Sequence, residues 1–274
     1  MPYSHAILFD LVLRGLYDSV GLWNKCNRAY DKFMGNNNGT SAHIPKNPQL
    51  VVLDEGSAVD SASRKAAIAD TDMVDVPFKI LTLPMLQEIE DQILLGNMNI
   101  NNFIMDADAA FSNKADALVL AEAVASAHAD NKLESLGPVL SYEDISMVDQ
   151  RFNILNIPRS QRIIVIPAAR TMEFQNLDIV KQAMAFNKEL LTGGVTVIDN
   201  KKFYISSVAP QIGGRDTVYG LSAQQMVVVL KGYMERKEVY STVTRKTAID
   251  YNSGLAVKLA RSVGAITVKM KAAA

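Results

Sequence analysis

The chain has 274 residues, a mass of 30.0 kDa and a formal net charge of −1. It is long enough for one large domain or two ordinary ones. Its 49% hydrophobic and 21% charged residues exclude a disordered chain, and its balanced charge argues against a dedicated nucleic-acid-binding domain, which needs an excess of Lys and Arg.

The residues that usually carry metal or nucleophilic chemistry are scarce. One cysteine, Cys26, excludes an intrachain disulfide and a thiolate metal cluster. Three scattered histidines, His5, His43 and His128, argue against a zinc site or a Ser-His-Asp triad. The apolar stretch 6–23 carries three charges and lacks the features of a secretory signal, so we expect no membrane association and synthesis in a reducing cytoplasm.

Residues 1–38 predict one amphipathic helix that ends at the Asn- and Gly-rich run 35–39. Its apolar residues recur at intervals of three, four or seven: Leu8, Val12, Leu16, Val20, Trp23, Tyr30 and Phe33. One helix cannot bury its own apolar stripe. The stripe could pack on its own domain or on a neighbouring subunit.

Residues 39–80 predict two extended arms joined by a tip of small and polar residues. The β-prone runs are 41–45, 49–54 and 74–80, and Pro77 indicates an edge strand. An isolated two-stranded ribbon is only marginally stable in water. We therefore expect this extended loop to become ordered across another surface.

The segment from Thr82 to residue 131 is predicted to form helices. Thr82 and Pro84 are typical of a helix start. Residues 106–131, rich in Ala and free of Gly and Pro, predict the longest helix, roughly 38 Å, with an alanine face formed by Ala117, Ala121 and Ala125. Gly137 and Pro138 mark the best boundary in the chain.

From Ser141 the pattern becomes a mixture of helices and strands, so the predicted class is α+β. Ser141 and Asp144 resemble a capping box that opens a helix to about Leu155. The elements expected after it are a buried strand at 162–166, a helix at 176–191, a hairpin at 195–205, a Gly-rich loop at 211–216, and strands at 226–230 and 254–270.

The polar motifs give no catalytic, cofactor-binding or metal-binding residue. Three carboxylate pairs (Asp70 with Asp72, Asp106 with Asp108, Glu88 with Asp91) lack an accompanying phosphate-binding glycine loop, and Asp106 and Asp108 suit a helix N-terminus. Arg215, after two glycines, could bind an anion, but a subunit contact is the favoured interpretation.

Four stretches, taken in order, resemble the major capsid proteins of tailed bacteriophages, which have the Hong Kong 97-type fold. They are 154–167 (ILNIPRSQRIIVIP), 189–199 (ELLTGGVTVID), 202–206 (KFYIS) and 259–268 (LARSVGAITV). The order of the elements resembles that family along nearly the whole chain. There is no long N-terminal scaffold-like segment, and we expect no covalent crosslink between subunits.

The resemblance implies a domain organisation. An N-arm helix would span 1–38 and an extended loop 39–80. The peripheral domain, with a long spine helix, would span 81–140 and the axial α/β domain 141–236. Closing strands would span 237–274.

The resemblance also implies a function. The chain would be a structural protein and not an enzyme, assembling as hexamers and pentamers into an icosahedral shell around double-stranded DNA, without sequence-specific binding. Scaffolding and portal proteins would be partners, and assembly would occur in the cytoplasm of a host bacterium. The residues expected at subunit interfaces are Leu16, Val20, Trp23, Arg64, Lys65 and Arg215. Two alternatives stay open: an encapsulin-like cellular nanocompartment shell, and an α/β enzyme.

Overall fold

The computed structural model describes residues 21–29, 31, 41–45, 73–88, 98–186, 196–198, 201–241 and 246–272. The helices are α4 (Met98–Ser126), α5 (Tyr142–Ile154), α6 (Thr171–Asn176) and α7 (Asp178–Phe186). The short 3₁₀ turns are η1 (Leu22–Lys25), η3 (Ala129–Asn131), η4 (Arg159–Gln161), η5 (Ala168–Arg170) and η6 (Ser262–Gly264). The strands are β1 (Ser41–Pro45), β2 (Met73–Pro77), β3 (Lys79–Glu88), β4 (Lys132–Glu134), β5 (Arg162–Pro167), β6 (Thr196–Ile198), β7 (Lys201–Ser206), β8 (Thr217–Ser222), β9 (Met226–Ser241), β10 (Lys246–Leu259) and β11 (Ala265–Lys269).

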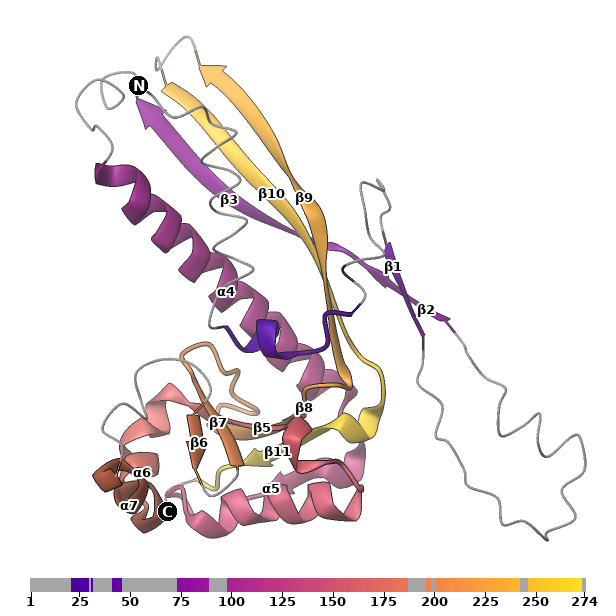
Figure 1. The fold of residues 1–274 in the computed structure, drawn as a ribbon, viewed down its shortest axis with the longest axis vertical. Coiled ribbons are helices and arrows are strands. Elements are labelled where there is room, and N and C mark those ends of the chain that lie inside the picture. The colour runs from indigo at the N-terminus through magenta and orange to yellow at the C-terminus, as the bar shows by residue number, and fades with distance from the viewer. Residues whose placement is uncertain are drawn as a thin grey trace, which may run out of the picture.

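A six-stranded mixed sheet, in the order β4-β11-β8-β5-β7-β6, forms the body at the base of Figure 1. Its strand β5 is buried on both faces, and its residues alternate between two cores. Ile163 and Val165 join the core that includes α4, whereas Ile164 and Ile166 join the core that includes α5. The sheet is therefore enclosed between the C-terminal part of α4 and α5.

A second sheet, in the order β3-β10-β9, extends away from the body alongside α4 (Figure 1). Strand β9 has 16 residues and β10 has 14, and both begin or end within the buried core at Met226 and Leu259. At ~3.3 Å per residue, β9 spans roughly 50 Å. The long sheet and the body thus share continuous strands.

The helix expected from Thr82 is wrong, because these residues form strand β3. Thr82 pairs with Asn252 in an antiparallel register, and its hydroxyl donates to Asn252 Oδ1 at 2.6 Å. The partner strand β10 satisfies the backbone of this segment, which overrides the local helix-start signal. Pro84 is tolerated because β3 is an edge strand.

The spine helix is confirmed as α4, with 29 residues and a length of roughly 44 Å. It begins at Met98 rather than at Asp106, so Asp106 and Asp108 lie inside the helix and the prediction that they occupy its N-terminus is wrong. No helix among the described residues is long and apolar enough to span a bilayer.

Strands β1 and β2 pair in an antiparallel register, as expected for the two arms of the extended loop. Ala42 and Val76 pack on Val227, Val229 and Ala256 of the long sheet, so the base of the ribbon is held by its own chain. The strand run expected at 49–54 and the loop tip lie outside the described residues.

The local signals of the body are confirmed. Ser141 and Asp144 form a capping box at the start of α5. Asn156, at φ 54°, ends α5 in a Schellman motif, in which the Ile157 amide donates to Phe152 at 3.0 Å. The helix expected at 176–191 differs, because an extended Leu177 separates α6 from α7.

Gly220 allows α5 to lie directly on the sheet. A Cβ atom at this position of β8 would lie 2.4 Å from Val148 Cγ1 and 2.9 Å from Phe152 Cε2. Both of these side chains are fully buried. Any side chain at Gly220 would therefore push α5 away from the sheet.

We predict that Gly220→Ala lowers the free energy of unfolding by about 1–3 kcal/mol, the usual cost of overpacking a core. Gly137→Ala is the matched control, because a Cβ there meets nothing within 4 Å. Chemical denaturation of both variants measures the difference. Equal stability of the two would show that α5 does not lie this close to β8.

Candidate assembly surfaces

A buried carboxylate joins three parts of the subunit. Asp116 of α4 is only 2% exposed. It accepts hydrogen bonds from the backbone amides of Leu22 at 3.1 Å and Trp23 at 2.8 Å, and from the Tyr204 hydroxyl at 2.7 Å. Burial raises the pKa of Asp116, and these three hydrogen bonds lower it again in part. Asp116 therefore connects the N-terminal segment, the spine helix and strand β7.

Trp23 corrects one of the interface predictions. Its side chain is 1% exposed within its own subunit, where its indole Nε1 lies 3.5 Å from Ser112 Oγ of α4. The Arg28 guanidinium stacks on the ring, 4.6 Å from its centroid. Trp23 is thus covered by its own chain and is not available to a neighbour.

Residues 26–29, which follow η1, are not helical, contrary to the single helix expected over 1–38. The Asn27 amide donates to Met226 at 2.9 Å and its carbonyl accepts from Val228 at 3.0 Å. The Leu230 amide donates to Asp31 Oδ1 at 2.9 Å. Pairing with strand β9 therefore competes successfully with continuation of a helix. Leu16 and Val20 lie outside the described residues, as do Arg64 and Lys65.

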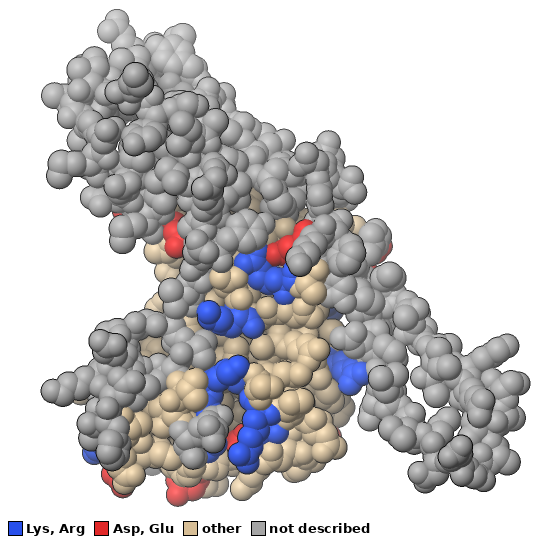
Figure 2. Space-filling view, viewed as in Figure 1, with Lys and Arg blue, Asp and Glu red and all other residues tan. Residues whose placement is uncertain are grey.

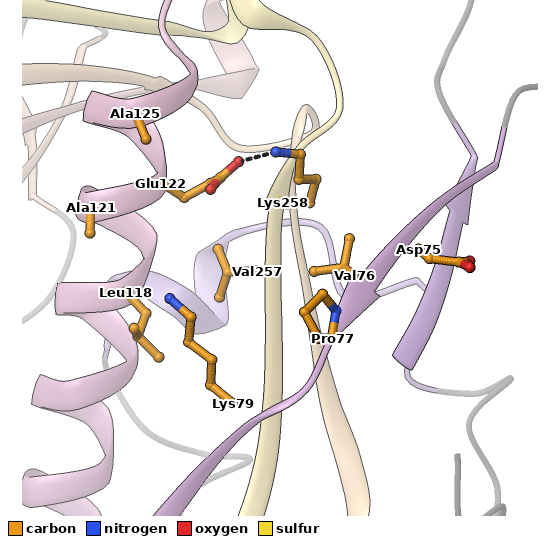
Figure 3. A pocket seen from close by; sticks show the side chains of 10 residues that line it. All are labelled: Asp75, Val76, Pro77, Lys79, Leu118, Ala121, Glu122, Ala125, Val257 and Lys258. Atoms are coloured by element: carbon orange, nitrogen blue, oxygen red, sulfur yellow. Dashed lines mark hydrogen bonds and ion pairs between the residues drawn. The ribbon is translucent and has the colours of Figure 1, made fainter. Parts of the chain in front are cut away.

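A groove of about 400 Å³ lies between α4, β10 and the end of β2 (Figure 3). The expected alanine face contributes Ala121 and Ala125 to it, beside Leu118. Lys258 closes one side through an ion pair with Glu122 at 2.8 Å. The groove is shallow and partly apolar, and within the described part of the chain nothing fills it.

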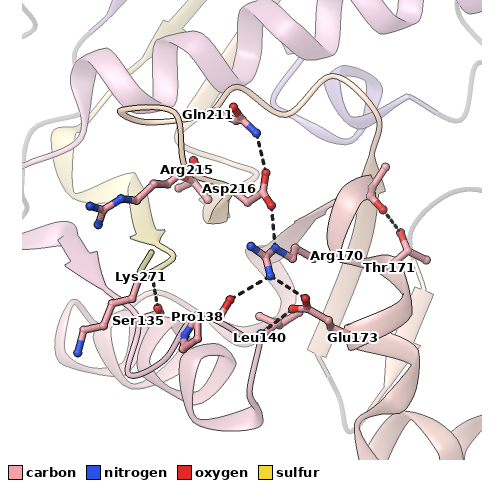
Figure 4. Close-up of polar contacts among 12 residues, drawn as sticks. Ser135, Pro138, Leu140, Arg170, Thr171, Glu173, Gln211, Arg215, Asp216 and Lys271 are labelled. Carbon is pink, nitrogen blue, oxygen red and sulfur yellow. Dashed lines mark hydrogen bonds and ion pairs between the residues drawn. The ribbon is translucent and has the colours of Figure 1, made fainter. Parts of the chain in front are cut away.

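An arginine clamp, centred on Arg170, fixes the loops at one edge of the body (Figure 4). Arg170 donates to Asp216 at 2.7 Å, to Glu173 at 2.6 Å and to the Pro138 carbonyl at 3.0 Å. Burial alone would raise the pKa of Asp216, but the bonds from Gln211 and Arg170 hold it below its ordinary value. The clamp therefore joins the loop after β4, helix α6 and the Gly-rich loop.

The Gly-rich loop closes as a hairpin turn. Ile212 and Arg215 exchange two backbone hydrogen bonds, of 3.0 and 3.3 Å. Gly213 and Gly214 have φ values of 62° and 72°, the conformation that a type I′ turn requires. The Arg215 side chain is directed away from the Arg170–Asp216 pair (Figure 4), so a contact of Arg215 with a neighbouring subunit stays a proposal.

Sequence reasoning missed an exposed apolar patch beside this clamp. Leu136 is 63% exposed, Val139 58% and Met172 76%. Arg170 brings them together, since it precedes Met172 closely in the chain and binds the carbonyl of Pro138. Leu136 and Val139 flank the Gly137–Pro138 turn, and this could have indicated an exposed apolar loop.

The remaining polar residues give no second type of site. No group of three or more potential metal ligands occurs within the described ranges. Asp106 is exposed, whereas Asp108 has a carboxylate oxygen without a hydrogen-bond partner and a pKa raised by burial.

We predict that Asp116→Ala lowers the free energy of unfolding by about 3 kcal/mol, because two amides and a hydroxyl lose a charged acceptor. Trp23 is the only tryptophan, so its fluorescence should shift to longer wavelength as the N-terminal segment detaches. Asp106→Ala, on the exposed side of the same helix, should leave both readouts unchanged. An unshifted emission in Asp116→Ala would contradict the role given to this carboxylate.

The sequence matches no protein-family model and no curated protein. The structure is similar to that of a protein of Mycobacterium phage Che8, with a TM-score of 0.64, 13% identity and 90% of each chain covered. It is also similar to a virus-like particle from Pyrococcus furiosus, with a TM-score of 0.60, 12% identity, and 98% of this chain and 100% of that chain covered. A third similar structure is the capsid of Ralstonia phage GP4, with a TM-score of 0.56, 11% identity, and 87% and 85% covered.

The similarity to these proteins lies in the backbone geometry over most of the chain, because the identities are low. Fold is what such a similarity establishes. The chain has the Hong Kong 97-type capsid fold.

Proposed function

We propose that the protein is a structural shell subunit that assembles with copies of itself into a closed icosahedral particle. The observation that carries this proposal is the elongated shape, in which the sheet β3-β10-β9 and helix α4 extend far from the body (Figure 1). Such a shape presents a large surface to neighbouring copies. Repeated contacts between symmetric copies would cover it.

The finer proposal is the major capsid protein of a tailed bacteriophage, with hexamers and pentamers enclosing double-stranded DNA. The phage-like stretches 154–167 and 189–206 support it. Scaffolding and portal proteins would be partners, assembly would take place in the host bacterial cytoplasm, and no catalysis is required. An encapsulin-like compartment is the second candidate, supported by the similarity to an encapsulin of Synechococcus elongatus, with a TM-score of 0.54 and 5% identity over 72% of the chain.

The exposed patch of Leu136, Val139 and Met172 is a suitable contact between copies. Leu136 and Val139 lie on a loop and Met172 on α6, and the arginine clamp joins these two segments, so little ordering entropy is lost on contact. Burying each such side chain contributes ~1.5–3 kcal/mol. The patch therefore offers a contact of moderate strength, repeated once per subunit.

We expect recombinant protein to form large particles of uniform size, visible by light scattering and electron microscopy. Leu136→Asp combined with Met172→Asp should prevent their formation without changing the circular dichroism of the subunit. Gln150→Asp, exposed on α5, is the control and should assemble normally. A chain that stays monomeric under all assembly conditions would contradict the shell proposal, whereas normal particles of the double variant would exclude only this patch.

The N-terminal residues allow a second test. The docked segment begins at Leu22, so deletion of residues 1–20 keeps the bonds to Asp116. We expect this deletion to abolish particles, through loss of an intersubunit contact by Leu16 and Val20, while Trp23 fluorescence stays as in the full chain. Normal assembly of the truncated protein would show that residues 1–20 make no essential contact.

A further inference from the structure

Three separate segments meet at the turn between β8 and β9. The Ala223 amide donates to Gln161 of η4 at 2.7 Å. The Asn27 side chain donates to the Gln224 carbonyl at 3.1 Å. The Ala260 amide, just after β10, donates to the Gln225 carbonyl at 2.8 Å. Residues 223–225 therefore hold the N-terminal segment, η4 and the end of β10 in one place.

Each of these segments carries a basic side chain: Lys25 in η1, Arg159 in η4 and Arg261 after β10. Together with Lys202 of β7 they form a set that we call the basic face. Lys25 and Arg159 are exposed, and Lys202 and Arg261 are half-buried. Lys202 reaches η4, where its ammonium group donates to the Ser160 carbonyl at 2.5 Å. The hydrogen bonds around the turn thus bring four positive charges from distant parts of the sequence together.

Figure 2 shows the consequence on the molecular surface. Lys and Arg gather across the middle of the face that presents η1, β7 and the loop after β10, and few Asp or Glu side chains interrupt them. The whole chain has a net charge of −1. The positive charge seen on this face is therefore a local feature and not a property of the composition.

The acidic groups packed near the basic face already have cationic partners. Asp31 pairs with Arg28 at 2.6 Å, and Asp149 pairs with Arg162 at 2.7 Å. Asp130, in η3, lies 3.8 Å from Arg151. Among the described residues, these acids are therefore bonded to arginines outside the basic face.

We infer that the basic face lines the interior of the particle and binds the phosphate backbone of the enclosed nucleic acid without sequence specificity. This inference rests on the proposed shell function. Phosphates neutralised by Lys and Arg release condensed counterions, and this supplies affinity that needs no base contact. Four charges per copy give weak binding, and many copies in one shell add up to substantial attraction.

A polyanion is favoured over an acidic peptide of a partner protein. A peptide interface needs buried apolar anchors. Among the described residues, the large exposed apolar side chains are Ile80, Leu136, Val139, Tyr142, Ile154, Met172 and Val197. Of these, only Ile154 lines a hollow with Arg261. The face also presents turns and strand ends rather than a helix, so nothing in it is shaped to read a DNA groove.

The first test measures binding of a random-sequence DNA duplex to unassembled full-length protein by fluorescence anisotropy over a range of salt concentrations. The variant is Lys25→Gln, Arg159→Gln, Arg261→Gln. The control carries the same charge change at exposed positions outside the face: Lys114→Gln, Lys132→Gln, Lys181→Gln. We expect the slope of log K against log salt to become less steep by about 0.9 for each contact removed, in the variant only.

Equal slopes in the variant and the control would overturn the inference. Stronger binding of a poly-glutamate peptide than of the duplex, at equal charge and salt, would overturn it in favour of a protein partner.

The second test locates the face in the particle. An amine-reactive reagent on a carrier too large to enter a closed shell should modify Lys25 in unassembled protein and leave it unmodified in particles, as read by mass spectrometry. Modification of Lys25 in intact particles would overturn the inward orientation and leave the shell function standing. Absence of any particle would instead count against the proposed function, so the two failures are distinguishable.

Discussion

The buried carboxylate of Asp116 determines how the parts of this subunit are positioned. A charged group taken out of water is costly unless hydrogen bonds replace the lost hydration. Here the replacement comes from the backbone at Leu22 and Trp23 and from Tyr204 on β7, so the bonds form only when all three parts are in place. Displacement of the spine helix would break all of them together. The geometry at the centre of the subunit is therefore specified by one side chain.

Strands β9 and β10 connect the core around α4 to the long sheet. Their inner ends contribute Met226, Val228 and Leu259 to the core around α4, and their outer parts form the long sheet. Because a strand cannot bend sharply without losing its ladder of hydrogen bonds, the direction of the sheet follows from the core. The base of the β1–β2 ribbon is fixed on the same strands through Val227 and Val229. The elements that reach farthest from the body thus take their direction from one core.

The sequence predicts best where the structure depends on neighbours along the chain. The capping box at Ser141 and the hairpin of β6 and β7 are local features, and both were predicted. Strand β3 could not be predicted in the same way, because Thr82 is 170 residues from its partner Asn252. Its helix-start signal was real but weaker than a complete set of cross-strand bonds.

The candidate surfaces were less predictable for a related reason. An amphipathic stripe shows that Trp23 must be covered but not by which chain, and the structure shows that its own α4 covers it. Asp116 could have been noticed, since it lies on the same helical face as Val119, Leu120 and Ala123, where a carboxylate is out of place. The basic face was beyond sequence reasoning. Lys25, Arg159 and Arg261 share no motif and meet through the turn at 223–225, and Lys202 joins them through its bond to Ser160.

The contrast between strong internal contacts and modest external ones is what a closed shell requires. Inside the subunit, Asp116 and Arg170 each join several segments through charge-assisted hydrogen bonds, which are the stronger kind. Among the described residues, few large apolar side chains are exposed, and the charges of the basic face act through salt-screened attraction. Weak contacts can break and reform while copies find their places in a symmetric lattice, whereas strong ones would trap errors. A subunit that is rigid inside and only moderately adhesive outside therefore combines a fixed shape with correctable assembly.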